Sequence, residues 1–184
     1  MKMRVLLPLS LLCLAAVAQA EAPPGSFAAS FVQTRSVPGF DTPIVSRGTM
    51  SYDKSKGFHW EVTRPYHYVF EMNGKQAHEQ LPDGTRHDLD PEQTPWLAAV
   101  EHIFISALSG DRSQLEAYFT VAEKPVPQGR ELTLTPKAGA IAQAIDRIEV
   151  EESAPGKPRH LQIFETAGGH MDIRFTPLPT AAQP

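Results

Sequence analysis

Apolar and polar residues alternate at every second position along much of the chain between Phe27 and Phe175. Because the side chains of a β-strand point alternately to its two faces, this pattern predicts strands with one apolar and one hydrated face. The strongest segments are FHWEV at 58–62 and YHYVFEM at 66–72, with shorter ones at 132–134, 148–150, 161–163 and 171–175. We expect all the apolar sets to face one shared interior.

Pairs of turn-forming residues separate these segments. They are Pro38-Gly39, Asn73-Gly74, Asp83-Gly84, Pro155-Gly156 and Gly168-Gly169. Asn-Gly and Asp-Gly favour tight hairpin turns, and Pro-Gly suits a type II turn, because glycine reaches positive φ without a steric penalty. The sequence therefore predicts a mainly β fold with a few helices, built on an antiparallel meander of about eight to eleven strands.

One stretch departs from the two-residue period. A capping threonine and a first-turn proline at 94–95 precede Trp96, Phe104 and Leu108, which recur at helical spacing as far as residue 110. A second, shorter helix is expected over 111–118. We expect the first helix to cover the apolar face of the sheet with these three side chains turned inward; a helix that simply plugs a barrel is the alternative.

The N-terminus has the layout of a cleavable signal peptide. Lys2 and Arg4 precede an apolar run at 5–17, and Ala18-Gln19-Ala20 closes it. We therefore predict a signal peptide over 1–20, a single domain over 21–177, a flexible Pro- and Ala-rich tail over 178–184, and export to the periplasm. A lipid-modified N-terminus at Cys13 is the alternative, although it needs a small residue where Leu12 stands.

Cleavage after residue 20 changes both the charge and the cysteine content. It leaves 15 basic residues against 21 acidic ones, a formal net charge of −6, and it removes the single cysteine. The processed protein then depends on core packing without a disulfide. An acidic chain with no run of Lys and Arg is also a poor match to nucleic acid or to anionic membrane surfaces.

Motifs for catalysis or metal binding are missing from the sequence. The seven histidines are scattered, with no His-x-x-x-His pair, and there is no Gly-x-Ser-x-Gly segment or cysteine nucleophile in the processed chain. Two pairs of carboxylates, Asp88 with Asp90 and Glu149 with Glu151, are each spaced two residues apart. The hydrated face of a sheet accounts for this spacing. We predict no catalytic residue, no metal and no cofactor.

Large apolar side chains are concentrated instead in two successive predicted strands. Seven fall within fifteen residues, all on inward positions. An ordinary sandwich core would also produce such a set. The members are Phe58, Trp60, Val62, Tyr66, Tyr68, Phe70 and Met72.

Several segments, in order, resemble the LolA-type outer-membrane lipoprotein carriers. SFAASFVQ at 26–33, with Phe-x-Gln at its core, resembles the family's opening strand, and GTMSY at 48–52 its second. Phe58-His59-Trp60 followed by Pro65 is similar to the family's Phe-x-Trp and later proline. The Asn-Gly at 73–74, LTPK at 134–137 and FTP at 175–177 also match, so the resemblance covers most of the processed chain.

The resemblance implies an incomplete antiparallel β-barrel, a half-barrel covered by helices, that holds acyl chains in an apolar cavity. By this resemblance Phe58 is the aromatic residue at the cavity mouth, and Lys54 stands where the family has an arginine that locks the lid. An amphipathic helix that usually precedes the first strand is missing here, since residues 21–25 include two prolines and a glycine. The expected cavity residues are Phe31, Met50, Tyr52, Phe58, Trp60, Val62, Tyr66, Tyr68, Phe70, Met72, Trp96, Phe104 and Leu108.

These expectations define a monomeric, non-enzymatic carrier of an acylated lipoprotein or glycolipid. The family further implies an inner-membrane transporter as donor and an outer-membrane acceptor. Two other functions use the same fold. A sensory or regulatory domain would bind acyl chains or envelope proteins and signal through a partner, and an enzyme would need convergent polar groups in the cavity.

Overall fold

The computed structural model describes residues 26–53, 55–73, 76–90 and 112–179. They form eleven strands and two short helices, α3 (Arg112–Tyr118) and α4 (Ala140–Ala144). The strands are β1 (Ser26–Ser36), β2 (Ile44–Asp53), β3 (Gly57–Arg64), β4 (Tyr68–Asn73), β5 (Gln76–Gln80), β6 (Arg86–Leu89), β7 (Phe119–Val126), β8 (Gly129–Pro136), β9 (Ile145–Glu152), β10 (Pro158–Glu165) and β11 (His170–Pro177).

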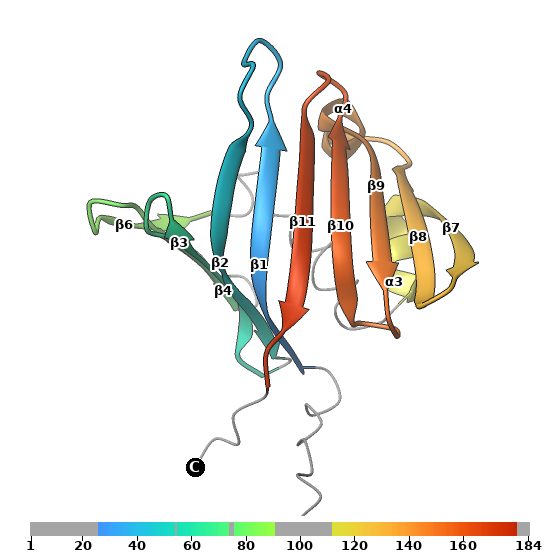
Figure 1. Cartoon of the computed structure of the whole chain (residues 1–184), viewed down its shortest axis with the longest axis horizontal. Helices are drawn as coiled ribbons and strands as arrows, with labels where there is room; N and C mark the ends of the chain where they lie inside the picture. The colour runs from blue at the N-terminus through green and yellow to red at the C-terminus, as the bar shows by residue number, and fades with distance from the viewer. Residues whose placement is uncertain (1–25, 54, 74–75, 91–111, 180–184) are drawn as a thin grey trace, which may run out of the picture.

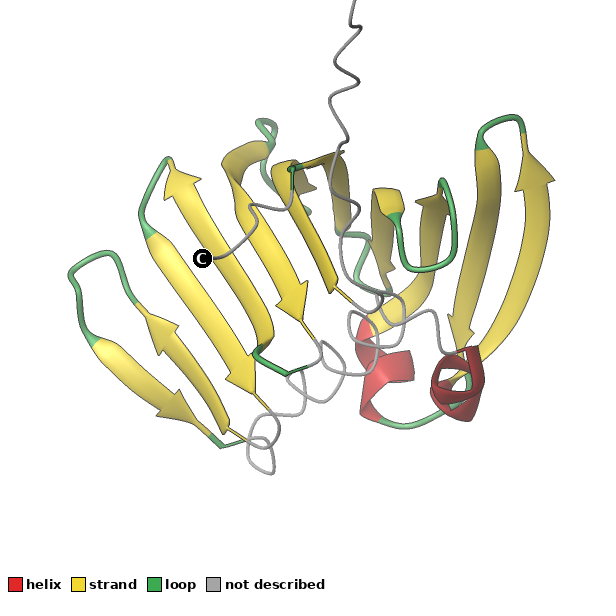
Figure 2. Ribbon diagram, turned by 90° about the horizontal axis from the view of Figure 1, so that it is seen from below, coloured by secondary structure: helices red, strands yellow, loops and turns green. Residues whose placement is uncertain are grey.

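All eleven strands belong to one antiparallel sheet, in the order β6-β5-β4-β3-β2-β1-β11-β10-β9-β8-β7. The sheet consists of two meanders, β1–β6 and β7–β11, which join where β1 pairs with β11 at the centre (Figure 1). Strands β6 and β7 are its two edges and do not pair with each other. The sheet is curved but open, as Figure 2 shows from below. This confirms the predicted mainly β fold and its incomplete antiparallel barrel.

The turn-forming pairs lie where the sequence predicted reversals. Pro38-Gly39 lies between β1 and β2, Asp83-Gly84 between β5 and β6, and Pro155-Gly156 between β9 and β10. Gly39, Gly84 and Gly156 all have positive φ, as these turns require. The short helix predicted over 111–118 is α3, whereas α4 was not predicted because five residues are too few to show a helical period.

One predicted strand start is wrong. The alternation places Tyr66 on an inward strand position, but β4 begins at Tyr68 and residues 65–67 form the reversal from β3. Pro65 has no N–H to give to a strand ladder, so pairing stops at that point. Tyr66 is consequently 72% exposed and does not reach the core.

Among the described residues, no helix has both the length and the apolar content needed to cross a bilayer.

Candidate functional site

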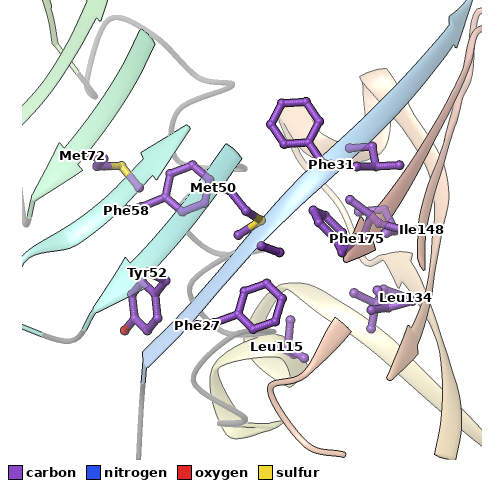
Figure 3. Packing of buried hydrophobic residues seen from close by; sticks show 14 of the residues in the cluster. Phe27, Phe31, Met50, Tyr52, Phe58, Met72, Leu115, Leu134, Ile148 and Phe175 are labelled. Carbon is purple, nitrogen blue, oxygen red and sulfur yellow. The ribbon is translucent and has the colours of Figure 1, made fainter. Parts of the chain in front are cut away.

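The apolar residues of both meanders lie on one face of the sheet, which we call the inner face. Strand register shows how they line up: Phe27 pairs with Tyr52, Tyr52 with Phe58, Phe58 with Met72, and Met72 with Ala77. Register partners share a face of the sheet, so these five side chains form one continuous apolar row over β1–β5. Figure 3 shows most of this row with the central residues around it.

The β7–β11 half continues the same face. Phe31 pairs with Phe175, and Leu161 pairs with both Ile173 and Val150. All five side chains are buried. Figure 3 shows Phe175, Ile148 and Leu134 beside Phe31, across β1 from the Phe58 side. The two halves therefore share one hydrophobic cluster whose buried members extend from β5 to β7 across the sheet.

A group of stacked rings forms the centre of the inner face. The Phe31 and Trp60 ring centroids are 3.9 Å apart with an interplanar angle of 23°. The Phe58 ring centroid is 6.3 Å from that of Trp60 and 6.2 Å from that of Phe70. We call these four residues the aromatic cluster. Trp60 is only partly buried, so it is the member of the cluster nearest to solvent.

Gly48 makes this stacking possible. It lies on β2 between Phe31 of β1 and Val62 of β3. A Cβ atom at this position would overlap the Glu61 carbonyl oxygen and come within 2.8 Å of Phe31 Cζ. Because glycine has no side chain, the Phe31 ring can lie over β2 and reach Trp60.

Polar groups appear on the inner face only toward the ends of certain strands. The Tyr68 hydroxyl donates to Glu79 Oε2 at 3.2 Å, and Gln33 pairs with the buried Ser46. Burial, followed by the nearby Glu79 charge, raises the pKa of Tyr68 to about 12. The inner face is thus apolar over the aromatic cluster and becomes polar toward the β1–β2 and β3–β4 turns.

A buried ion pair lies at the opposite end of the other half-sheet. The Glu152 carboxylate is 1% exposed, and its Oε2 accepts from Arg130 Nε at 2.7 Å and from Nη2 at 2.6 Å. Among the described residues, no group donates a hydrogen bond of normal geometry to its Oε1. Burial raises the Glu152 pKa, and the Arg130 charge opposes that rise. On β8 and β9 the pair lies next to the apolar residues Leu132 and Val150, at the end of the apolar row. The Arg130 guanidinium compensates the buried carboxylate charge.

Helix α3 is fixed to the sheet beside this pair. Leu115 is buried in the hydrophobic cluster, Arg112 Nη1 lies 2.7 Å from Glu123 Oε2 on β7, and Lys137 Nζ donates to the Glu116 carbonyl at 2.6 Å. Glu123 also lies 3.5 Å from Arg130 Nη1. Ion pairs therefore connect α3, β7, β8 and β9, so α3 acts as a fixed wall of the inner face.

The outer face carries further charged residues, including histidines paired with carboxylates. His59 Nδ1 lies 3.1 Å from Glu71 Oε1, His78 Nδ1 2.7 Å from Asp88 Oδ1, and His160 Nε2 2.7 Å from Asp172 Oδ2. Within the described ranges, no three His, Cys, Asp or Glu side chains are grouped as a metal site requires. Each histidine here has a carboxylate partner that accounts for its position.

This geometry can be compared with known proteins. A family model described as "Outer membrane lipoprotein carrier protein LolA" matches residues 25–184. The chain belongs to the LolA family. The carriers of this family are periplasmic and non-enzymatic, and membership indicates a carrier of lipoproteins or lipids. No curated protein sequence matches the chain.

Several solved structures are similar to this LolA-family chain. A LolA superfamily protein from Nitrosomonas europaea has 10% identity and a TM-score of 0.47, covering 88% of this chain and 89% of the other. A putative outer membrane lipoprotein-sorting protein domain from Vibrio parahaemolyticus has 8% identity and a TM-score of 0.46, covering 89% of each chain. The lipoprotein LppX of Mycobacterium tuberculosis has 9% identity and a TM-score of 0.41, covering 83% and 86%.

The predicted site residues, thirteen for the cavity and Lys54 for the latch, divide into three groups. Nine lie on the inner face, one lies elsewhere, and four positions fall outside the described residues. The inner-face residues are Phe31, Met50, Tyr52, Phe58, Trp60, Val62, Tyr68, Phe70 and Met72. Tyr66 lies in the exposed β3–β4 turn. Trp96, Phe104, Leu108 and the predicted latch Lys54 are the positions outside the described residues.

Sequence reasoning missed part of this face. Phe27 continues the Phe31 alternation, and Phe175 belongs to a segment already identified as a strand, so both could have been included. Leu115 could not, because nothing in the sequence shows that α3 packs on the inner face. The Glu152–Arg130 pair was also missed, since alternation alone gives no reason to bury a glutamate.

Proposed function

We propose that this LolA-family protein carries the acyl chains of a lipoprotein or glycolipid across the periplasm on the inner face of its sheet. The observation that carries the proposal is a continuous apolar face, spanning both halves of a sheet whose edges are not joined. An acyl chain exposed to water costs about 0.8 kcal/mol per CH₂ group, so transport requires such a surface. An ordinary core would have the same composition, and the family match favours a carrier.

The side chains that would receive the acyl chains are those around the aromatic cluster. Trp60, Val62 and Tyr68 are partly buried and lie on adjoining strands, whereas Phe58 and Phe70 are deep in the cluster. Met50 and Met72 flank the rings, and their unbranched side chains can adapt to a hydrocarbon of variable shape. Cargo would therefore enter along Trp60 and displace flexible neighbours before it reached Phe58.

The burial of Phe58, the residue that the family resemblance places at the cavity mouth, decides how this position can be tested. Phe58 is fully enclosed, so Phe58→Glu would bury a charge and test the fold together with binding. Trp60 gives a direct probe because it is one of only two tryptophans in the chain. In a Trp96→Phe variant, all tryptophan emission comes from Trp60.

The test is quenching of Trp60 emission by a fatty acid with a brominated acyl chain. The proposal predicts strong quenching in the Trp96→Phe variant, with a loss of quenching when unlabelled acyl chains compete. The matched control places the tryptophan on the outer face, as Thr49→Trp with both native tryptophans changed to phenylalanine; Thr49 pairs with Glu61 on the hydrated side. Equal quenching from both positions, or none from Trp60, refutes the carrier proposal.

Native mass spectrometry of the protein exported by its own cell would identify the cargo. An acylated species bound in a fixed ratio supports the carrier function and distinguishes a lipoprotein from a glycolipid. A stable protein partner without lipid would support the sensory alternative instead. Transfer from an inner-membrane transporter to an outer-membrane acceptor, as in the family, is part of this proposal.

A further inference from the structure

The hairpin that joins β1 and β2 is unusual for an exposed turn, because three large apolar side chains lie on it. Phe40 is 75% exposed, Ile44 53% and Val45 47%. Figure 1 shows this hairpin projecting at the top of the sheet, opposite the end where β11 finishes. Half of the six large hydrophobic residues exposed in the described chain are therefore on one short segment.

The exposed apolar side chains of the hairpin point in different directions. Phe40 occupies the turn, while Ile44 and Val45 are successive residues of β2 and point to opposite faces of the sheet. Neither has a partner on β3, because the β2–β3 pairing ends with Arg47 and Arg64. A protein groove would cover one face of such a hairpin, whereas the acyl region of a bilayer surrounds it.

Two arginines lie directly below the hairpin. Arg47 and Arg64 are register partners on β2 and β3 and both are exposed. Among the described residues, neither guanidinium takes part in an ion pair or a side-chain hydrogen bond. Like charges side by side are unfavourable without a counter-ion, and a guanidinium binds phosphate with two parallel hydrogen bonds. The pair lies where lipid phosphates would be if the hairpin entered the acyl region.

We propose that the β1–β2 hairpin docks this protein on a bilayer that contains anionic phospholipid, with Phe40, Ile44 and Val45 below the headgroups and Arg47 and Arg64 at the phosphates. The net negative charge of the chain opposes its approach to an anionic bilayer. The interaction therefore depends on Arg47 and Arg64, and it weakens as the salt concentration rises. Asp41, the one acidic residue in 36–45, lies in the turn beside Phe40 and limits the depth of insertion.

Cosedimentation with vesicles tests this surface without any cargo, so its outcome is separate from that of the carrier proposal. The probes are vesicles of phosphatidylcholine alone and of phosphatidylcholine mixed with phosphatidylglycerol. The protein is purified as exported, with its N-terminal residue verified by mass. We expect binding to the mixed vesicles, weaker binding to phosphatidylcholine, and a decline with increasing salt.

Two double variants and one control complete the experiment. Phe40→Ser with Val45→Ser should lower partitioning at least about tenfold, and Arg47→Gln with Arg64→Gln should lower it about fivefold per arginine. Leu178→Ser removes another exposed apolar side chain, 40% exposed, at the opposite end of the sheet and should leave binding unchanged. Absence of wild-type binding, or an equal loss in the Leu178 variant, overturns the proposal.

Discussion

Phe31 and Trp60 stack ring on ring although the strand between them separates their backbones. Phe31 is on β1 and Trp60 on β3, and their centroids are nevertheless 3.9 Å apart. The contact crosses β2 at Gly48, where a side chain would collide with the Phe31 ring. The centre of the proposed binding face therefore depends on a residue that contributes no surface to it.

Gly48→Ala tests that dependence. The new methyl group would overlap a backbone oxygen of β3, which cannot move without disturbing the sheet. We expect a loss of about 2–4 kcal/mol in the free energy of unfolding and a red shift of Trp60 emission. Urea unfolding followed by tryptophan fluorescence, with both variants made in the Trp96→Phe background, measures both. Ser51→Ala, at an outward position of the same strand, is the control and should change neither.

The ion pair of Arg130 with Glu152 predicts a pH-dependent penalty. Arg130→Met leaves a buried carboxylate uncompensated, which costs about 3–5 kcal/mol at pH 7. Burial already raises the Glu152 pKa, and without Arg130 it rises further. A carboxyl group whose pKa is raised by folding stabilises the fold at pH values below its pKa in the unfolded state. That stabilisation is lost as the pH rises through its pKa in the folded state. The variant should therefore be less destabilised at pH 5 than at pH 7.

The double variant Arg130→Met with Glu152→Met separates charge from packing. It removes both charges and keeps apolar volume, so it should recover most of the lost stability at pH 7. Urea unfolding at the two pH values gives the comparison. A double variant as unstable as Arg130→Met alone would show that shape, and not the unpaired carboxylate, causes the loss.

Tyr68 should make the protein sensitive to high pH. Its pKa is raised to about 12 from 10, so the folded state holds the phenol proton more tightly than the unfolded state. Stability from this group is complete below pH 10 and is lost as pH rises through 12, by roughly 2 kcal/mol in total. Tyr68→Phe should flatten this part of the stability profile, and spectrophotometric titration should show one fewer late-titrating tyrosine. An unchanged profile would contradict the assignment.

Helix α3 should be held mainly by one apolar side chain. Leu115→Ala removes a buried side chain from the hydrophobic cluster and should cost about 2–5 kcal/mol. Arg112→Gln breaks exposed ion pairs to Glu116 and Glu123, which solvent screens, so it should lower the stability much less than Leu115→Ala does. Thermal unfolding of both variants tests the order. A larger effect at Arg112 would mean that charge, and not packing, fixes the helix.

Alternation predicted the sheet well because its period is strict and one face is buried. Phe58, Trp60, Phe70 and Met72 all lie on the inner face as predicted, and four of the five predicted turn-forming pairs lie between strands; the fifth, Asn73-Gly74, includes a residue outside the described ranges. What alternation could not give was the pairing of β1 with β11, since partners more than 130 residues apart leave no local signal. Tyr66 fits the alternation and still lies outside the strand, because Pro65 cannot contribute an N–H to the ladder.

The chemistry around the inner face was less predictable than its apolar residues. Gly48 looks like any strand glycine until its neighbours on β1 and β3 are known. Glu152 follows the same alternation as Val150, which would favour an apolar residue at that position; Arg130 is what makes a glutamate tolerable there. Both features arise from contacts between strands, which a single sequence does not contain.

The free edges at β6 and β7 have a mechanical consequence. In a closed barrel every strand has two partners, so strand number and tilt fix the interior volume. Here the curvature can increase or relax by small changes in twist at each of ten strand pairs, with every backbone hydrogen bond kept. The curvature of the inner face is then adjustable, which is what the proposed carrier function requires if its cargoes differ in their number of hydrocarbon tails.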